Sequence, residues 1–496
     1  MSGLNWGVLL PILAYLGVLY LVAARSNRLM TRSSSFLEEY FLGSRGMGAF
    51  VLALTLVATY ASGSSFLGGP GVAYKVGLGW VLLAMIQVPT ALLTLGVLGK
   101  RFAILARRIG AVTLNDFLRA RYESPWVVVL GAVAALVFFS AAMTAQFVAG
   151  GRLLQSVTGL PYGGALALFA GTVVLYTTVG GFRAVVLTDA VQGVVMLLGT
   201  LLLLGATVAA GGGIGHITAT LRSIDPALLT PFGPGGFVSR PYILSFWVLV
   251  GFGVVGLPFS AVRCMGYRDS RSLHRGILLS TGVLAALMLG MHLAGVFGRA
   301  VLPNLTEVDR IIPELSLHLL PPVLAGLFLA GPLAAIMSTV DSQLILASAA
   351  VVKDLYLNYV APGAEATPEG KARVKRLSLG CTALLGILPF LVAYDPPTII
   401  VWINLFAFGG LEAAFLLPTV LGLYWKRANA PGALASMAVG MVSFVAIQQM
   451  TKRVLDMHVI VPSLALAAAA FVAVSLVTAP PKERVLHLFW GDRPLP

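Results

Sequence analysis

The chain of 496 residues is 58% hydrophobic and only 10% charged, with a net charge of +14. Soluble domains carry about 25% charged residues, so this composition excludes an ordinary soluble protein and indicates a membrane protein. The positive charge does not indicate a nucleic-acid partner, because it collects in short connections between apolar runs, where it faces the cytoplasm and anionic lipid.

Apolar runs long enough to cross the hydrocarbon as helices recur from residues 4–24 to residues 459–477. We therefore predict an all-α polytopic membrane protein with about 13 transmembrane helices in one domain, residues 1–496. The first helix, residues 4–25, is expected to be an extra N-terminal helix that is retained, because basic residues follow it and no small-residue cleavage site does.

The second apolar segment, residues 52–71, is interrupted by glycine, serine and proline, and so is the seventh, residues 247–263. Such breaks leave backbone groups unpaired, which is tolerated where the backbone lines a cavity or a ligand. The two segments lie an odd number of helices apart, so they predict repeats of opposite topology, residues 47–210 and 241–425, around a transport site. The alternative is that glycine and proline are simply common in membrane helices, which would suffice for a single broken helix.

Basic residues cluster in the connections predicted to be cytoplasmic, residues 25–45, 100–121, 263–275 and 371–376. This positive-inside bias predicts an outside N-terminus and a cytoplasmic C-terminus. We expect residues 101–121 to form a short interfacial helix. Residues 432–478 are expected to form extra C-terminal helices, and residues 479–496 a short, loosely ordered cytoplasmic tail.

Three acidic residues fall inside predicted spans or at their ends, where charge is costly and usually functional. Asp189 begins the sixth span, so it is either a helix N-terminal carboxylate in the interface or an electrostatic station on a cation's inward route. Asp341 is expected to continue the polar face of Ser338 and Ser342. For Glu412 an interhelical hydrogen bond and a substrate contact are both open.

The ninth span carries hydroxyl groups at Ser338, Thr339 and Ser342, within about one helical turn of each other. Oxygen ligands suit a small, hard cation, so these groups could face the unwound carbonyls of the second span. The alternative is that the hydroxyls serve helix packing or bond back to carbonyls of their own helix.

Several segments carry a family resemblance. Residues 180–192 (GGFRAVVLTDAVQ), 333–344 (LAAIMSTVDSQL) and 424–440 (YWKRANAPGALASMAVG) resemble the solute:sodium symporter family. Further segments are similar to its bacterial pantothenate-transporting members, namely residues 39–87, 100–108, 246–264 and 401–418. The resemblance runs along nearly the whole chain.

This resemblance implies a LeuT-type inverted repeat, spans 2–6 and 7–11, that imports pantothenate with sodium by alternating access in a bacterial inner membrane. It implies a sodium site between the second and ninth spans, formed by carbonyls of Ala58, Ala61 and Ala335 and hydroxyls of Ser338 and Thr339. Asp189 matches an acidic residue on the inward sodium path. Two positions depart from the family: Tyr60 stands where proline-transporting members have aspartate, and Phe259 stands where many members have histidine.

A pantothenate pocket should combine hydrogen-bond donors with apolar walls. From polarity and depth in the membrane, the candidate substrate-binding residues are Ser62, Ser64, Ser65, Gln87, Gln146, Trp247 and Asn404. No arginine is expected near the middle of the membrane. The carboxylate would then be held by half-helix N-termini, free backbone N–H groups or sodium itself.

Other functions remain open from sequence. A carrier of the same family for another small carboxylate, an amino acid or a sugar is the nearest, and a passive channel or a membrane sensor is of a different class. No catalytic constellation indicates an enzyme, and residues 96–101 lack the spacing of a phosphate-binding loop. The two cysteines, Cys264 and Cys381, indicate no metal cluster. The expected partners are the solute, sodium as the coupling ion and lipid, with no nucleic acid, no other cofactor and no obligate protein partner.

Overall fold

The computed structural model describes residues 6–30, 36–42, 46–396 and 400–491. Within these residues the fold is helical, apart from an antiparallel hairpin of β1 (Arg453–Val454) and β2 (Met457–His458). The α-helices are α1 (Trp6–Met30), α2 (Phe36–Phe41), α3 (Ala49–Tyr60), α4 (Gly69–Val76), α5 (Leu78–Met85), α6 (Thr90–Val97), α7 (Gly99–Arg108), α8 (Leu114–Tyr122), α9 (Pro125–Thr158), α10 (Tyr162–Ala210), α11 (Ile214–Ile224), α12 (Arg240–Phe246), α13 (Pro258–Gly266), α14 (Ser270–Val301), α15 (Ile311–Leu319), α16 (Pro322–Ala349), α17 (Pro368–Leu385), α18 (Ile387–Tyr394), α19 (Ile400–Tyr424), α20 (Ala430–Met450), α21 (Ile460–Val477) and α22 (Glu483–Trp490). Shorter 3-10 and π-helical turns join them, η1 (Ser64–Gly68), η2 (Pro226–Leu229), η3 (Pro234–Gly236), η4 (Trp247–Phe252), η5 (Gly253–Gly256), η6 (Val308–Arg310), η7 (Ala350–Val360) and η8 (Ala364–Ala366).

Among the described residues, 11 helices are long and apolar enough to cross a membrane, or up to 13 when each of two bent pairs counts as one span. The bent pairs are Ala49–Tyr60 with Ser64–Val76, at 67°, and Arg240–Gly256 with Pro258–Gly266, at 50°. They are the second and seventh spans in chain order. The predicted fold class and both predicted interruptions are therefore confirmed.

The local sequence explains both breaks. Helix α3 ends at Tyr60, and the next residue, Ala61, has an extended backbone (φ −71°, ψ 110°). The chain then resumes with the π-turn η1, and Pro70 lies in the first turn of α4. In the seventh span, Leu257 is extended and Pro258 opens α13. A proline disfavours the helical conformation in the residue before it, which explains the extended Leu257. In the second span Gly69, the residue before Pro70, is helical (φ −63°, ψ −50°), so the break there lies earlier, at Ala61.

Helix α10 contains two spans, Tyr162–Phe182 and Ala184–Ala210, because the chain kinks at Gly181. Gly181 has φ 60° and ψ −174°, a conformation that glycine adopts without a side-chain clash. The kink redirects the second half of α10, which carries Asp189 toward α3.

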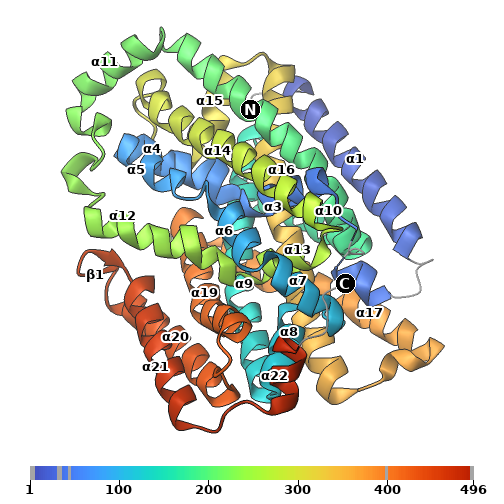
Figure 1. Cartoon of the computed structure of the whole chain (residues 1–496). Coiled ribbons are helices and arrows are strands. Elements are labelled where there is room, and N and C mark those ends of the chain that lie inside the picture. The colour runs from blue at the N-terminus through green and yellow to red at the C-terminus, as the bar shows by residue number, and fades with distance from the viewer. Residues whose placement is uncertain (1–5, 31–35, 43–45, 397–399, 492–496) are drawn as a thin grey trace.

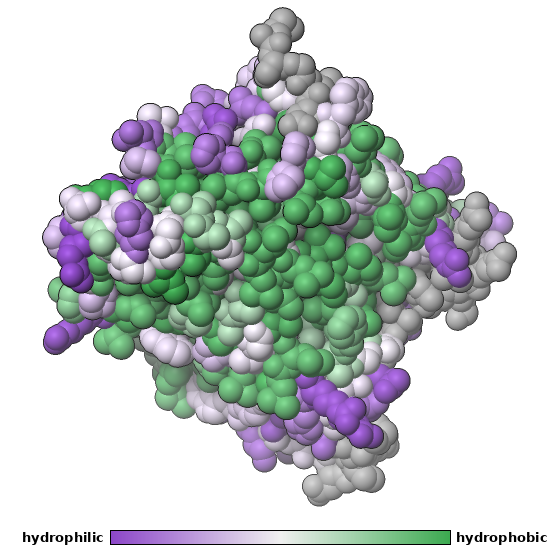
Figure 2. Space-filling model, turned by 90° about the horizontal axis from the view of Figure 1, so that it is seen from above, coloured by the Kyte–Doolittle hydropathy of each residue, from purple (hydrophilic) through white to green (hydrophobic). Residues whose placement is uncertain are grey.

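The spans differ in how deeply they lie in the molecule. The spans of α16 and α19 are each 83% buried, whereas α1 is 22% buried and α20 and α21 are 33% buried. Figure 1 accordingly shows α1 along one side of the molecule and α20 with α21 on the other. Figure 2 shows a broad apolar surface, with hydrophilic residues gathered toward its margins. Helices α16 and α19 therefore form the centre around which the broken spans pack.

The chain after Pro480 is not loosely ordered, so that expectation is wrong up to residue 491. Helix α22 docks on α7 and α8, where Arg108 Nη1 donates to the Leu488 carbonyl at 2.8 Å. Glu123 pairs with Lys482 at 3.0 Å and Arg484 at 2.7 Å. The single interfacial helix expected over residues 101–121 is likewise two short helices, α7 and α8, separated by a turn at Gly110. The contacts of Arg108 and Glu123 with residues 482–488 hold this C-terminal segment in place.

Candidate functional site

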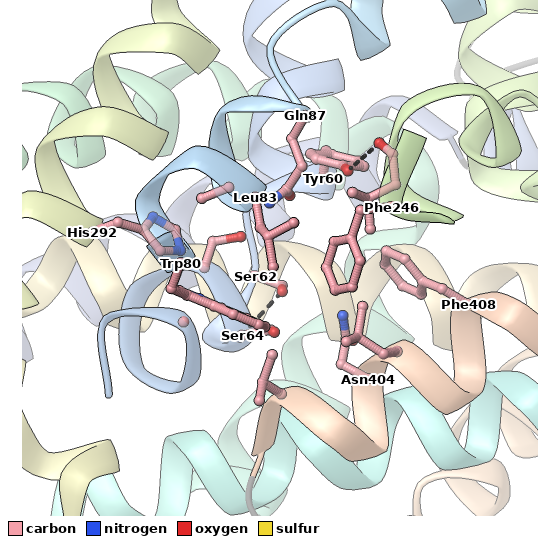
Figure 3. A pocket seen from close by; sticks show the side chains of 16 residues that line it. Tyr60, Ser62, Ser64, Trp80, Leu83, Gln87, Phe246, His292, Asn404 and Phe408 are labelled. Atoms are coloured by element: carbon pink, nitrogen blue, oxygen red, sulfur yellow. Dashed lines mark hydrogen bonds between the residues drawn. The ribbon is translucent and has the colours of Figure 1, made fainter. Parts of the chain in front are cut away.

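A small cavity lies where both broken spans meet α5, α14 and α19 (Figure 3). The lining residues are Tyr60, Ser62, Ser64, Ser65, Gly69, Trp80, Leu83, Ala84, Gln87, Phe246, Val250, His292, Val401, Asn404, Leu405 and Phe408. None of these side chains is an aspartate, glutamate, lysine or arginine. The cavity therefore offers uncharged polar groups between aromatic and aliphatic walls.

Most of the predicted substrate residues lie at this cavity, namely Ser62, Ser64, Ser65, Gln87 and Asn404. Trp247 does not, because its side chain is 45% exposed and turned away from the lining. Its neighbour Phe246 faces the cavity together with Val250, one helical turn later. Adjacent helical residues point about 100° apart, so choosing Trp247 in place of Phe246 was a register error.

Gln146 lies behind the cavity wall and is fully buried. Its Oε1 accepts from the Gly63 N–H at 2.8 Å, and its Nε2 donates to Asn404 Oδ1 at 3.3 Å. The approach of α9 is possible because Gly63 has no side chain: a Cβ there would lie 2.5 Å from Ala149 Cβ. Gln146 therefore connects the break in the second span to a cavity residue on α19.

Four backbone N–H groups at this break, of the kind expected to be free for a carboxylate, are already bonded. Gly63 N–H donates to Gln146, and Ser64 N–H donates to Ser62 Oγ at 3.2 Å. The N–H groups of Ser65 and Phe66 donate to the Ser62 carbonyl at 2.9 and 3.0 Å. These four groups are therefore not available to an anionic group in the cavity, which can use side-chain donors or a cation.

The predicted sodium ligands on α16 reach the end of α3. Ser338 Oγ donates to the carbonyls of Ala58 at 2.7 Å and Ala335 at 3.1 Å. Thr339 Oγ1 donates to the carbonyls of Ala335 at 2.9 Å and Thr59 at 3.3 Å. Ala61, which follows α3, belongs to the same break. The structure thus gathers hydroxyl and carbonyl oxygens, which are the ligands that a hard cation prefers.

Asp189 lies inside α10 rather than at a helix N-terminus, so the interpretation as a helix N-terminal carboxylate is wrong. The residue is fully buried, and its Oδ2 accepts from Thr55 Oγ1 at 2.5 Å, Arg263 Nη2 at 3.3 Å and Thr59 Oγ1 at 3.4 Å. Arg263 is also fully buried and donates to Ser342 Oγ at 2.8 Å. An arginine placed by its sequence in a cytoplasmic cluster is therefore an internal charge, against expectation.

Thr59 joins the oxygen cluster to this charge pair. Its carbonyl accepts from Thr339, and its hydroxyl lies between Arg263, Asp189 and Ser342. Polar groups therefore continue without a gap from the end of α3 to Asp189, along the faces that α3, α10, α13 and α16 turn toward each other.

The other two intramembrane acids lie elsewhere. Asp341 does not continue the face of Ser338 and Ser342, since its Oδ1 accepts from Thr177 Oγ1 on α10 at 2.5 Å. Glu412 is fully buried but does not line the cavity, and among the described residues neither of its carboxyl oxygens has a hydrogen-bond partner. Both expectations for Glu412 are therefore wrong. It packs against η5, where Gly253 leaves room for it.

A second, smaller cavity lies beside the first. Tyr60 lines both cavities, and its hydroxyl donates to the Val250 carbonyl at 3.2 Å, which Thr90 Oγ1 also bonds at 3.1 Å. Phe259 lines the second cavity and lies 5.9 Å from Phe408 of the first, centroid to centroid. Tyr60 therefore stands between the two cavities and separates them.

Sequence reasoning missed His292, Trp80 and Arg263 as site residues. A lone histidine in the apolar run of α14 is a usable signal, since polar groups in membrane helices are usually functional. Trp80 stands near a helix start, where tryptophan usually marks the membrane interface. Arg263 stands at a predicted helix end among other basic residues, so its burial had no signal in the sequence.

The family model described as "Sodium:solute symporter family" matches residues 40–440. The chain is 53% identical over 464 residues to the sodium/pantothenate symporter of Escherichia coli (strain K12), covering 94% of this chain and 95% of that protein. It is 30% identical over 495 residues, 97% of each chain, to the osmoregulated proline transporter OpuE of Bacillus subtilis. Among solved structures, a Na⁺-coupled sialic acid symporter matches with a TM-score of 0.79 at 17% identity, covering 96% of this chain and 98% of that one. Mhp1, a nucleobase-cation-symport-1 family transporter, matches with a TM-score of 0.54 at 15% identity, covering 90% and 97%; at these identities both likenesses show the fold alone.

Proposed function

The chain belongs to the sodium:solute symporter family, and from this membership we propose that it imports pantothenate with sodium by alternating access. The observation that carries the proposal is the cavity at the two broken spans, bordered on the side of α16 by hydroxyl and carbonyl oxygens. The relatives that are 53% and 52% identical are both sodium/pantothenate symporters and align over 94% of this chain.

Sodium is proposed to bind the carbonyls of Ala58, Ala61 and Ala335 and the hydroxyls of Ser338 and Thr339. These two hydroxyls donate to carbonyls of α3 in the structure. Rotation of the hydroxyls would turn their lone pairs toward an ion and leave the same carbonyls to ligate it. Sodium bound there would replace hydrogen bonds that now join α16 to the break, and so would hold the break in shape.

Asp189 is proposed as the next station on the inward route, since polar groups run from the oxygen cluster to its carboxylate. Arg263 holds that carboxylate in the structure. A sodium ion that arrives there must share Asp189 with a fixed positive charge, which weakens its binding and favours its release toward the cytoplasm.

The solute is proposed to pass from the first cavity to the second when Tyr60 moves. A single charge gains about 2.3 kcal/mol per 100 mV on moving inward, and tenfold accumulation of a solute requires about 1.4 kcal/mol. Anionic pantothenate carried with one sodium moves no net charge, so at that ratio only the sodium concentration gradient drives uptake.

The location is proposed to be a bacterial inner membrane, with the N-terminus outside and the C-terminus in the cytoplasm. Helices α7 and α8 carry the basic cluster of residues 100–121, pack against α22 and support this orientation. Residues 47–210 and 241–425 are proposed as the inverted repeats, each beginning with a bent span.

Uptake of radiolabelled pantothenate into proteoliposomes, with and without an inward sodium gradient, tests this function. We expect sodium-dependent accumulation that excess unlabelled pantothenate abolishes. Sodium-driven uptake of a different carboxylate, amino acid or sugar would keep the family and reject the substrate. If pantothenate uptake is the same with and without the sodium gradient, symport is rejected in favour of a passive pathway.

A further inference from the structure

We propose that the cavity admits its substrate in one orientation only, with a substrate hydroxyl at His292 and the carboxylate at Asn404, so that His292 selects hydroxylated carboxylates. This inference rests on the proposed function. Two short hydrogen-bond chains, one on each side of the cavity, support this inference. Each begins at a backbone group that can act in one way only, as a donor (N–H) or as an acceptor (carbonyl).

On one side, His292 Nδ1 lies 2.7 Å from the Met288 carbonyl. A carbonyl only accepts, so Nδ1 carries the proton. Among the described residues no acidic side chain lines the cavity to balance an imidazolium, and His292 is 2% exposed. The imidazole is therefore neutral, and its Nε2 is an acceptor. Gly69 leaves Nε2 open, because a Cβ there would lie 2.4 Å from that nitrogen.

On the other side, the chain begins at the Gly63 N–H, which only donates. Gln146 must therefore present Oε1 to it, and does so at 2.8 Å. This leaves Gln146 Nε2 to donate to Asn404 at 3.3 Å, so Asn404 must present Oδ1 to Gln146. The remaining amide group of Asn404, Nδ2, is a donor at the cavity, and Figure 3 shows its nitrogen pointing into the space between the labelled side chains.

Trp80 adds a second donor to the lining. The indole N–H can only donate, the residue is 4% exposed, and Nε1 has no partner among the described residues. Its ring lies 5.8 Å from that of Trp402 on α19, centroid to centroid. A buried polar group without a partner is costly, so a substrate acceptor that reaches this N–H removes that cost.

The chemistry of pantothenate then decides the orientation. A carboxylate only accepts hydrogen bonds, so it is repelled by the Nε2 lone pair of His292 and matched by the donors of Asn404 and Trp80. The two hydroxyls, at the opposite end of the molecule, can donate to His292. A substrate that lacks a hydroxyl at this distance from its carboxylate leaves Nε2 desolvated and unpaired, and sites of this kind reject such analogues strongly.

The test compares two variants against two analogues in sodium-driven proteoliposomes. His292→Phe removes the acceptor and keeps a ring, and Asn404→Leu removes the donor. The competitors of pantothenate uptake are pantothenol, which lacks the carboxylate, and N-(3,3-dimethylbutanoyl)-β-alanine, which lacks both hydroxyls. In the wild type we expect each analogue to compete at least about tenfold more weakly than pantothenate.

His292→Phe should abolish the preference for the hydroxyls and keep the preference for the carboxylate, and Asn404→Leu should do the opposite. His292→Gln, which can again offer an oxygen acceptor, should restore the hydroxyl preference in part. If His292→Phe does not reach the membrane, Gly69→Ala, which places a methyl group against Nε2, should show the same loss.

An unchanged hydroxyl preference in His292→Phe, or the reversed pattern between the two variants, would overturn the inference while the proposed function stands. Absence of sodium-driven pantothenate uptake in the wild type would instead overturn the proposed function, and this inference with it.

Discussion

Ser338 bonds both to its own helix and across to α3. The bond to the Ala58 carbonyl on α3 distinguishes Ser338 from a serine that only packs or bonds within its own helix. Ser348, on the same helix and equally buried, instead bonds the Ser378 carbonyl, away from the break. The two serines therefore form a matched pair for a test of the sodium site.

We expect Ser338→Ala to raise the sodium concentration needed for half-maximal pantothenate uptake at least about tenfold, since one oxygen ligand is lost. Ser348→Ala should leave it unchanged. The measurement is initial uptake at stepped sodium concentrations and constant ionic strength. Equal sodium dependence in the two variants would place the ion elsewhere.

The pair of Arg263 and Asp189 predicts a strongly non-additive pattern. Asp189→Asn leaves the Arg263 guanidinium buried without its counter-charge, which typically costs about 3–5 kcal/mol. The double variant Asp189→Asn with Arg263→Met removes both charges and should recover most of that stability, though not sodium-driven uptake. Thermal unfolding in detergent of the wild type, the two single variants and the double variant measures this coupling. If the loss of stability in the double variant equals the sum of the losses in the single variants, the two residues do not interact directly.

At the scale of elements, both breaks were predictable because glycine, serine and proline inside an apolar run are a local property of the chain. The burial of Arg263 and the docking of α22 were not, since they depend on partners far along the sequence, such as Asp189 and Glu123. The choice between Phe246 and Trp247 needed the helix register, which composition does not supply.

The close approach of the second span to α9 gives a prediction at this scale. In Gly63→Ala the new methyl would lie 2.5 Å from Ala149 Cβ and 3.0 Å from Gln146 Oε1. The span must shift, which typically costs about 1–3 kcal/mol, and the bond to Gln146 is lost. We expect a higher KM for pantothenate and a lower melting temperature.

Gly164→Ala is the matched control, because no atom of the described residues lies within 4 Å of the Cβ it would add. Uptake kinetics and melting of both variants are compared in the same detergent. A KM in Gly63→Ala equal to that of the control would show that the break tolerates displacement from α9.

At the scale of the whole molecule, sodium should stabilise the fold by mass action. A ligand present at 100 times its Kd adds about 2.7 kcal/mol. We therefore expect sodium to raise the melting temperature above that in potassium at equal ionic strength, and Ser338→Ala to remove most of the difference. Identical melting in the two salts would argue against a site that is formed in the resting protein.

The proposed orientation is tested by labelling with a membrane-impermeant maleimide. The background carries Cys264→Ser and Cys381→Ser, and the probes are Arg222→Cys on α11 and Arg373→Cys on α17, both at exposed positions. Arg222→Cys should react in intact cells, and Arg373→Cys only after the membrane is permeabilised. The opposite pattern would invert the topology.

The hydrogen-bond chain from Gly63 through Gln146 to Asn404 begins at the break that Ala58 and Ala61 also shape. An ion that fixes this break therefore fixes which amide group Asn404 turns to the cavity, so it prepares the donor before the solute arrives. Linkage then demands reciprocity: the factor by which sodium tightens solute binding equals the factor by which the solute tightens sodium binding. Replacing Gln146 by leucine should abolish this mutual gain while both ligands still bind, and the transporter would then leak each of them without the other.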